Sequence, residues 1–254
     1  MTATRQDTVI FLGPSLERDA ATDILNGCYL PPAEQGSVIA AVQRFSPRTI
    51  VLIDGSFASV PAVRHKELLW AISNGVQVIG AASIGALRAA ELHEFGMAGH
   101  GFIYRWFRAT IGADDDEVAV AMSPVEIGAR PLSEALINIR MTLRSAALTG
   151  VICKDTQKSL VEVARALDFR DRTYQKMFEV VETTRSAHIC RSLPRLAEWI
   201  VDHSINQKAS DAQDLLTALS NRDPEVLPPS IKQPFRMTDA WLADLEAAGL
   251  RIGN

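Results

Sequence analysis

The sequence has no surplus of positive charge, and this absence narrows the range of partners. Its 26 lysine and arginine residues are outnumbered by 30 aspartate and glutamate residues, which gives a net charge of −4. Such a chain has no basic excess with which to neutralise phosphates. Aromatic residues, which stack on bases, make up only 6%. We therefore expect no nucleic-acid partner.

Long apolar runs and paired cysteines are also missing. No stretch approaches the roughly 20 apolar residues that span a bilayer, and the first nine residues, MTATRQDTV, lack the apolar segment of a secretory signal. The three cysteines, Cys28, Cys153 and Cys190, form no CxxC pair and no zinc spacing with the five histidines. We expect a cytoplasmic protein with no membrane contact, whose thiols are reduced and mostly buried and which binds no metal.

Three short, almost wholly apolar runs predict a parallel sheet in the N-terminal half. They are residues 8–13 (TVIFLG), 49–55 (TIVLIDG) and 77–81 (QVIGA). Strands that are covered on both faces of a parallel sheet have this composition. Helical patterns at 37–45 and 60–73 separate the runs, which is the order of right-handed βαβ units. A fourth short strand is expected at 117–122 (EVAVAM).

After Pro131 the strand signals stop and helical patterns follow. They cover residues 133–148, 155–167, 171–184, 193–203, 209–219 and 239–248. The proline-rich stretch 223–235 predicts a loop or an extended arm. We predict an α/β fold with an open, mainly parallel sheet and flanking helices in the N-terminal half, followed by a mostly helical C-terminal half. The expected domains are a core of residues 1–130 and a partner-binding helical region of residues 131–254 that packs on it.

Small residues follow each of the three predicted strands. Ligands of open parallel sheets bind outside the carboxyl ends of the strands. Here these ends carry Gly13-Pro14-Ser15, Asp54-Gly55-Ser56 and residues 80–85 (GAASIG). No GxxxxGK[ST] or GxGxxG pattern occurs in the chain, which argues against a phosphate-binding loop. The glycine-rich strand ends still leave a small-molecule binding module as one interpretation.

The third strand end contains the sharpest candidate, Ser83. The pattern Ala81-x-Ser83-x-Gly85 resembles a nucleophile elbow, in which small neighbours allow a tight turn that exposes a hydroxyl group. Ser83 precedes the predicted helix 84–95, whose free N–H groups favour developing negative charge, and the N–H of Ile84 is a candidate oxyanion donor. The pattern is loose, and from the residues alone a plain N-cap serine is the more frequent outcome.

A nucleophilic serine needs a base, for which the nearby sequence offers His65, His93 and Lys66. On a helix of residues 60–73, Lys66 would lie on an apolar stripe, with residues 62–63 one turn before it and residues 69–70 one turn after. Loss of hydration there would lower its pKa and make the neutral amine available. The alternative is that Lys66 extends its amine to solvent.

Three other features allow more than one interpretation. The acidic run at residues 114–117 could bind a hard cation, although a solvated acidic turn is more frequent. The glycines around residues 96–101 predict a mobile loop, as a lid or a plain connection. Arg88 either faces the candidate pocket or pairs with Glu91 one turn away.

Seven stretches within about residues 8–145 form a recognisable series. They are residues 11–16 (FLGPSL), 29–33 (YLPPA), 53–57 (IDGSF), 62–67 (AVRHKE), 80–92 (GAASIGALRAAEL), 95–97 (FGM) and 115–119 (DDEVA). Together they resemble the TfuA-like family, named from trifolitoxin biosynthesis, and the GAASIGALRAAEL block is the most specific. The family often has Gly-Asp after Pro31-Pro32-Ala33, whereas this sequence has Gly36-Ser37. No catalytic acid is therefore expected there.

The resemblance implies a partner of a YcaO enzyme in the backbone thioamidation of ribosomal peptides. It implies a hydrolase that acts on a thiocarboxylated, ThiS-like carrier protein and delivers sulfide, without a cofactor and with only indirect contact to the precursor peptide. The implied catalytic pair is Ser83 and Lys66. The residues expected around the substrate or the oxyanion are Gly13, Asp54, Gly55, Ile84 and Arg88. The rival interpretation is a non-catalytic adaptor that recruits the peptide or the sulfur carrier to YcaO.

Overall fold

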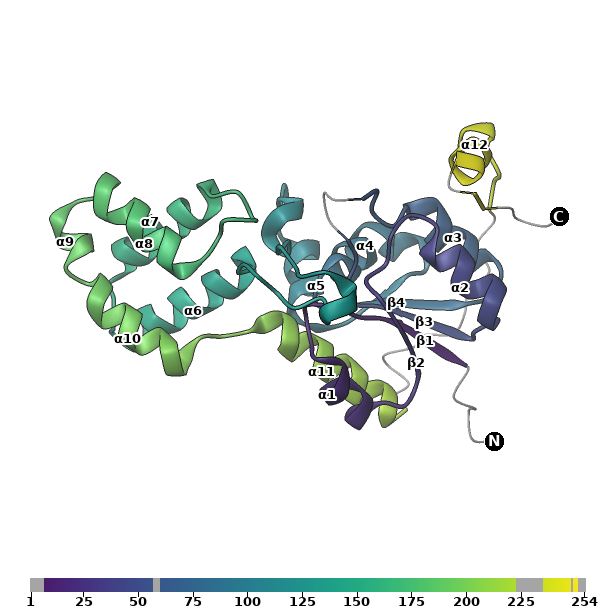
Figure 1. The fold of residues 1–254 in the computed structure, drawn as a ribbon, viewed down its shortest axis with the longest axis horizontal. Helices are drawn as coiled ribbons and strands as arrows, with labels where there is room; N and C mark the ends of the chain where they lie inside the picture. Colours follow the sequence, from purple (N-terminus) through teal and green to yellow (C-terminus); the bar gives the residue numbers. More distant parts are fainter. Residues whose placement is uncertain (1–6, 57–59, 223–234, 248, 251–254) are drawn as a thin grey trace. The chain divides into compact units, whose positions relative to one another are not determined.

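The computed structural model describes residues 7–56, 60–222, 235–247 and 249–250. The chain divides into two compact units, one of Met1–Gly112 with Ala209–Asn254 and one of Ala113–Lys208 (Figure 1). The sequence placed its domain boundary after residue 130, whereas the units change after residues 112 and 208. The reason for the second change is that the chain returns to the first unit to cover its sheet.

The first unit is built on a five-stranded sheet. Its strands are β1 (Thr8–Phe11), β2 (Cys28–Leu30), β3 (Thr49–Leu52), β4 (Gln77–Gly80) and β5 (Ala98–Gly99). They lie in the order β2-β1-β3-β4-β5, and every neighbouring pair is parallel. This confirms the predicted open parallel sheet. The strand order reverses between β1 and β3, which is the point where doubly wound sheets bind their ligands.

Helices cover both faces of this sheet (Figure 1). Alternate strand residues such as Phe11 and Leu52 pack against α2 (Ser37–Phe45), α3 (His65–Ser73) and α4 (Ile84–Leu92). The residues between them, such as Ile10 and Val51, pack against α1 (Arg18–Ile24) and α11 (Gln207–Ser220). Because both faces are buried, the strands read as continuous apolar runs.

The glycine-containing stretch 96–101, expected as a mobile loop or a plain connection, contains the short strand β5 and leads into a helix. After the short 3-10 helix η1 (His93–Phe95) and β5, the chain forms α5 (Gly101–Ala109). The carboxylate of Asp211 on α11 accepts a 2.7 Å hydrogen bond from the N–H of Ile103 in the first turn of α5. Gly101 has a φ of +92°, and a Cβ there would lie 2.5 Å from Asp211. The stretch therefore connects η1 to α5 through β5, and Gly101 serves the start of that helix.

The last helix, α12 (Asp239–Ala247), also belongs to the first unit. Its buried residues Trp241 and Leu245 pack against Ile39 of α2. Most of the expected proline-rich arm, residues 223–234, lies outside the described residues.

The second unit is helical, as predicted. It contains α6 (Leu136–Leu148), α7 (Lys154–Ala166), α8 (Tyr174–Thr184), α9 (Ala187–Cys190) and α10 (Leu193–His203), with the 3-10 helices η2 (Asp115–Glu117) and η3 (Val125–Ile127). One apolar cluster joins α6, α7, α8 and α10 through residues such as Leu143, Leu160 and Leu196. None of the helices in the described part of the chain has the length and apolar character needed to cross a membrane.

The predicted strand at 117–122 is wrong. Residues 115–117 form η2, and the Glu117 carboxylate pairs with Arg140 of α6 at 2.7 Å. The ammonium of Lys208 donates to the carbonyl of Val118 at 2.8 Å. Val118 and Ala119 are buried, and the N–H of Ala121 donates to the Ser133 hydroxyl. Met122 forms only an isolated bridge with Pro131, so no strand develops here.

The acidic run at 114–117 forms ion pairs. Asp114 pairs with Arg165, and Asp116 pairs with the fully buried Arg172 at 2.6 Å. These contacts, with the one between Glu117 and Arg140, anchor the start of the second unit to its helices. These ion pairs give the acidic run a structural role.

Candidate active site at the strand ends

Asp54 occupies the point where the strand order reverses. It follows β3 and is only 1% exposed. Its Oδ2 accepts hydrogen bonds from the N–H groups of Gly13 at 2.9 Å and Ser15 at 3.0 Å, and its Oδ1 accepts the Ser15 hydroxyl at 2.6 Å. Asp54 therefore fixes the loop after β1. Because the Gly13 amide is engaged in this contact, it is not available to an oxyanion.

The Ser83 turn has a strained backbone. Ala82 is a non-glycine residue with a φ of +65°, and the N–H of Ser83 donates to the carbonyl of Ala81 at 2.7 Å. A hydrogen bond to the second residue before, around a positive φ, defines a γ-turn of the rarer and strained kind. Such strain persists only where surrounding structure imposes it, and it concentrates at functional sites.

Ser83 itself is the N-cap residue of α4, but its side chain does not cap the helix. Its φ of −116° and ψ of −132° are unusual, and its hydroxyl makes no capping hydrogen bond. Within the described residues, no hydrogen bond of any kind involves this hydroxyl. The residue is 6% exposed. A plain N-cap serine would bond to the first turn of its helix, so the geometry favours another role for this hydroxyl group.

Two backbone N–H groups beside this turn have no acceptor among the residues that the structure describes. They belong to Ile84, the first residue of α4, and to Gly55, which follows Asp54. The two residues touch, because a Cβ on Gly55 would lie 2.8 Å from Cγ2 of Ile84. Free N–H groups at a helix start favour negative charge. Of the two glycines named as oxyanion donors, the structure thus leaves Gly55 available.

Lys66 lies in the first turn of α3, which starts at His65 and not at residue 60. The predicted earlier start is wrong because Ala62 bridges to Glu34 and the N–H of Gln35 bonds to Pro61, which keeps residues 61–62 extended. The expected stripe with residues 62–63 is therefore absent.

The Lys66 ammonium is bound by the C-terminal segment. It donates to the Arg236 carbonyl at 3.2 Å and to the Thr238 hydroxyl at 3.1 Å, and it lies 5.7 Å from the centre of the Phe235 ring. No hydrogen bond in the described structure joins Lys66 to Ser83. In the chain α3 follows β3 and returns to the start of the parallel strand β4. The start of α3 therefore lies at the carboxyl-end edge of the sheet, as the Ser83 turn does.

Arg88 forms an ion pair with Glu91 on its own helix. Its guanidinium donates to Glu91 at 2.7 Å and to the carbonyl of Val63 at 3.2 Å, and His65 lies 2.7 Å from the same Glu91 oxygen. Burial alone would raise the pKa of Glu91, but the hydrogen bonds from His65 and Arg88 outweigh it and hold this pKa below its ordinary value. The predicted pairing of Arg88 with Glu91 is confirmed.

Glu67 is a buried carboxylate that the sequence did not single out. It is 1% exposed and accepts the N–H groups of Arg64, Gly36 and Val38 at 2.7 to 3.1 Å. Burial raises its pKa although these hydrogen bonds oppose the change. Glu67 joins the starts of α2 and α3, so its role is to position the helix that carries Lys66.

Cys153 contradicts the expectation that the cysteines are mostly buried. It is exposed and is the N-cap residue of α7, while Cys28 and Cys190 are partly buried. Its Sγ lies 3.3 Å from the Thr156 hydroxyl and 4.0 Å from Nε2 of His188. Hydrogen bonds from Thr156, with a further one from His188, lower the pKa of the Cys153 thiol to about 6. The signal in the sequence was Cys-x-x-Thr at the start of a predicted helix.

We expect Cys153 to be the first cysteine that iodoacetamide modifies at pH 7. The thiolate is the reactive form, so its alkylation rate should rise with pH through about 6 and then level off. Cys190, whose Sγ contacts the carbonyls of Val181 and Arg185, should react more slowly. Peptide mass spectrometry over a pH series measures both, and His188→Ala should move the Cys153 midpoint upwards. A midpoint near the ordinary value of about 8.5 would contradict this.

Comparison with known proteins supports the resemblance seen in the sequence. A family model described as TfuA-like protein matches residues 54–173. The matched segment includes Asp54, Lys66 and Ser83 and extends into the second unit. The loop after β1, with Gly13 and Ser15, precedes it. No curated protein matches the chain.

Proposed function

We propose that the protein hydrolyses a thiocarboxylated, ThiS-like carrier protein and delivers the sulfide to a YcaO enzyme, because its residues 54–173 match the TfuA-like family model. This match supports a role in the YcaO-associated thioamidation system. The hydrolytic step is our extension of that role. It assigns Ser83 as the nucleophile and Lys66 as the base.

The observation that carries the proposal is the state of the Ser83 turn. The hydroxyl makes no capping bond, the backbone before it is strained at Ala82, and the amides of Ile84 and Gly55 have no acceptor in the described residues. A nucleophile needs an unengaged hydroxyl, and a tetrahedral intermediate needs fixed N–H donors. A helix cap requires neither of these features.

The proposed hydrolysis balances in atoms and charge without a cofactor. The neutral amine of Lys66 takes the proton of the Ser83 hydroxyl as its oxygen attacks the thiocarboxylate carbon. The N–H groups of Ile84 and Gly55 stabilise the oxyanion. When the carbon–sulfur bond breaks, the Lys66 ammonium returns the proton to sulfur, which leaves as hydrosulfide. Water then cleaves the acyl–serine ester and restores the hydroxyl. In this mechanism the Lys66 side chain turns away from Arg236 and Thr238 and releases its own proton to solvent before it acts.

A second candidate function is that of a non-catalytic adaptor, which would recruit the peptide or the sulfur carrier to YcaO. It is favoured by the engagement of Lys66 with Arg236 and Thr238. In that case the Ser83 turn would be a structural remnant.

The experiment that separates the two functions is sulfide release in the absence of YcaO. We expect the full-length protein to release several equivalents of sulfide from a thiocarboxylated ThiS-like carrier, while the intact mass of the carrier changes from thiocarboxylate to carboxylate. A carrier with an ordinary carboxylate is the control and should yield no sulfide. Binding of the thiocarboxylated carrier without turnover would contradict the hydrolase and favour the adaptor.

A further inference from the structure

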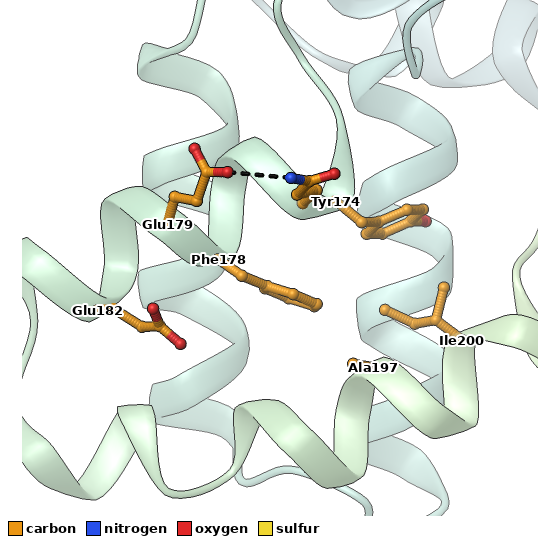
Figure 2. Close-up of a pocket in the computed structure, with 7 residues that line it drawn as sticks. Tyr174, Phe178, Glu179, Glu182, Ala197 and Ile200 are labelled. Atoms are coloured by element: carbon orange, nitrogen blue, oxygen red, sulfur yellow. Dashed lines mark hydrogen bonds between the residues drawn. The ribbon is translucent and has the colours of Figure 1, made fainter.

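The second unit contains a groove between two of its helices. It is bordered by α8 and α10 and has a volume of about 450 Å³. Figure 2 shows Phe178 of α8 pointing toward Ala197 and Ile200 of α10, with Glu179 and Glu182 on the α8 side. The groove is formed entirely within residues 113–208, and none of the residues proposed for catalysis lines it.

The floor of the groove is apolar. Phe178 and Tyr174 pack on the apolar cluster of this unit, which includes Ile200. Val201, one turn after Ala197, is 78% exposed and extends the apolar surface along α10. Exposed apolar surface beside a groove, rimmed by polar groups, is typical of an interaction site.

The charged side chains that line the groove are both acidic. Glu179 is 3.1 Å from the Lys176 ammonium, whose hydrogen bond lowers the pKa of this carboxyl, so it is ionised at neutral pH. Glu182, one turn after Phe178, forms no ion pair with any residue in the described ranges. Lys176 offsets the charge of Glu179, whereas Glu182 has no counter-ion in the described ranges, so the rim keeps a negative charge beside an apolar floor. This complements an apolar side chain flanked by a lysine or an arginine.

The spacing of the lining residues indicates the shape of the partner. Tyr174, Phe178 and Glu182 follow one another at intervals of one helical turn on α8, and Ala197 and Ile200 lie three residues apart on α10. An amphipathic helix presents its apolar residues at the same interval, and helices of this kind dock into grooves between helices.

We propose that the groove between α8 and α10 binds an amphipathic helix of a partner protein, with the apolar stripe of that helix on Phe178, Ala197 and Ile200 and its flanking lysines or arginines against Glu179 and Glu182. The groove belongs to the second unit and the Ser83 turn to the first. Such binding goes beyond the proposed hydrolysis and does not depend on it.

The test uses two fluorescent helical peptides and the full-length protein. Both peptides carry the same leucine stripe at intervals of three and four residues, flanked by lysine in one and by glutamate in the other. Fluorescence anisotropy should show that the lysine peptide binds at least about ten times more tightly, and that added salt weakens its binding.

Variants of the groove separate this site from general attraction to an acidic protein. Ala197→Trp fills the groove without changing its charge and should weaken binding of the lysine peptide about tenfold or more. The double variant Glu179→Gln with Glu182→Gln should weaken it about fivefold to tenfold. Glu198→Gln removes an exposed carboxylate of α10 that does not line the groove, and it should bind as the unmodified protein does. Thermal unfolding checks that each variant is folded.

Three outcomes would overturn the proposal. They are equal affinity for the two peptides, undiminished affinity in a folded Ala197→Trp variant, and a dimer in sedimentation experiments that Ala197→Trp abolishes. The last would show that the groove is filled by a second copy of this chain.

Discussion

Replacing Ser83 by alanine should lower sulfide release from the thiocarboxylated carrier by at least about 10³-fold and leave the stability of the fold nearly unchanged. Loss of a nucleophilic serine removes the covalent route and leaves only what binding and oxyanion stabilisation contribute. The stability should change little because the Ser83 hydroxyl makes no capping bond. Sulfide assays measure the activity and urea unfolding measures the stability, both on the same purified Ser83→Ala protein.

The alternative interpretation of Ser83 predicts the opposite pair of results. A serine that caps a helix contributes about 1 kcal/mol to stability and nothing to turnover. Thr173 provides the matched control, because its hydroxyl accepts the Lys176 N–H at 3.1 Å at the start of α8. Thr173→Ala should therefore lose about 1 kcal/mol of unfolding free energy and keep its activity. If Ser83→Ala behaved in the same way, Ser83 would be a cap.

Lys66 is tested in the same assay. As the base, Lys66→Ala should lower sulfide release by about 10²- to 10⁴-fold. This substitution also removes the contacts to Arg236 and Thr238, so Thr238→Val serves as the control. It removes one of these contacts and keeps the amine, and it should retain activity. Equal losses in the two variants would indicate that Lys66 acts by holding the C-terminal segment.

The sheet was predictable because its strands are buried on both faces. Residues 37–45 were predicted as a helix, and α2 has these bounds, since its apolar residues repeat at the helical interval beside two continuous apolar strands. The short strands β2 and β5 were not predicted. They have three and two residues, and their pairing with β1 and β4 depends on where the sheet edges lie.

The positions of distant segments were not predictable from local patterns. A helix near residues 209–219 was predicted, but not that Leu215 and Leu216 of α11 would cover the sheet face formed by Ile10 and Val51. The sequence also contained no sign that Arg236 and Thr238 would bind Lys66, about 170 residues away. Both outcomes depend on how the whole chain packs.

The sequence predicted where a candidate site would lie, but not which hydrogen bonds its members make. Small residues at three parallel strand ends predicted where side chains would gather. Only the structure assigns Asp54 to hold the loop after β1 and leaves the amide of Gly55 without an acceptor among the residues that it describes. Hydrogen bonds of this kind depend on distances of a few tenths of an ångström, which a motif does not encode.

Gly85→Ala should be the most destabilising of the substitutions considered, by more than about 3 kcal/mol. A Cβ at this position would lie 1.8 Å from the carbonyl oxygen of Leu52, in a backbone segment that cannot move aside without breaking the sheet. Gly80 faces the same constraint, since its Cβ would lie 1.9 Å from the carbonyl oxygen of Gly85. Urea unfolding should show a lower midpoint with an unchanged slope, or no folded protein at all.

Gly75→Ala separates close packing from backbone strain. Gly75 has a φ of +84° but open space within 4 Å of its Cβ position, so alanine there should cost only about 1 kcal/mol. If Gly85→Ala cost no more than Gly75→Ala, the close approach of α4 to β3 would be wrong. The larger expected cost at Gly85 implies that the glycine after Ser83 is required by the packing of α4 on the sheet. The packing of the fold then explains the small residues of the elbow pattern, and they are no evidence for catalysis. That evidence depends on the Ser83 hydroxyl and the amides beside it.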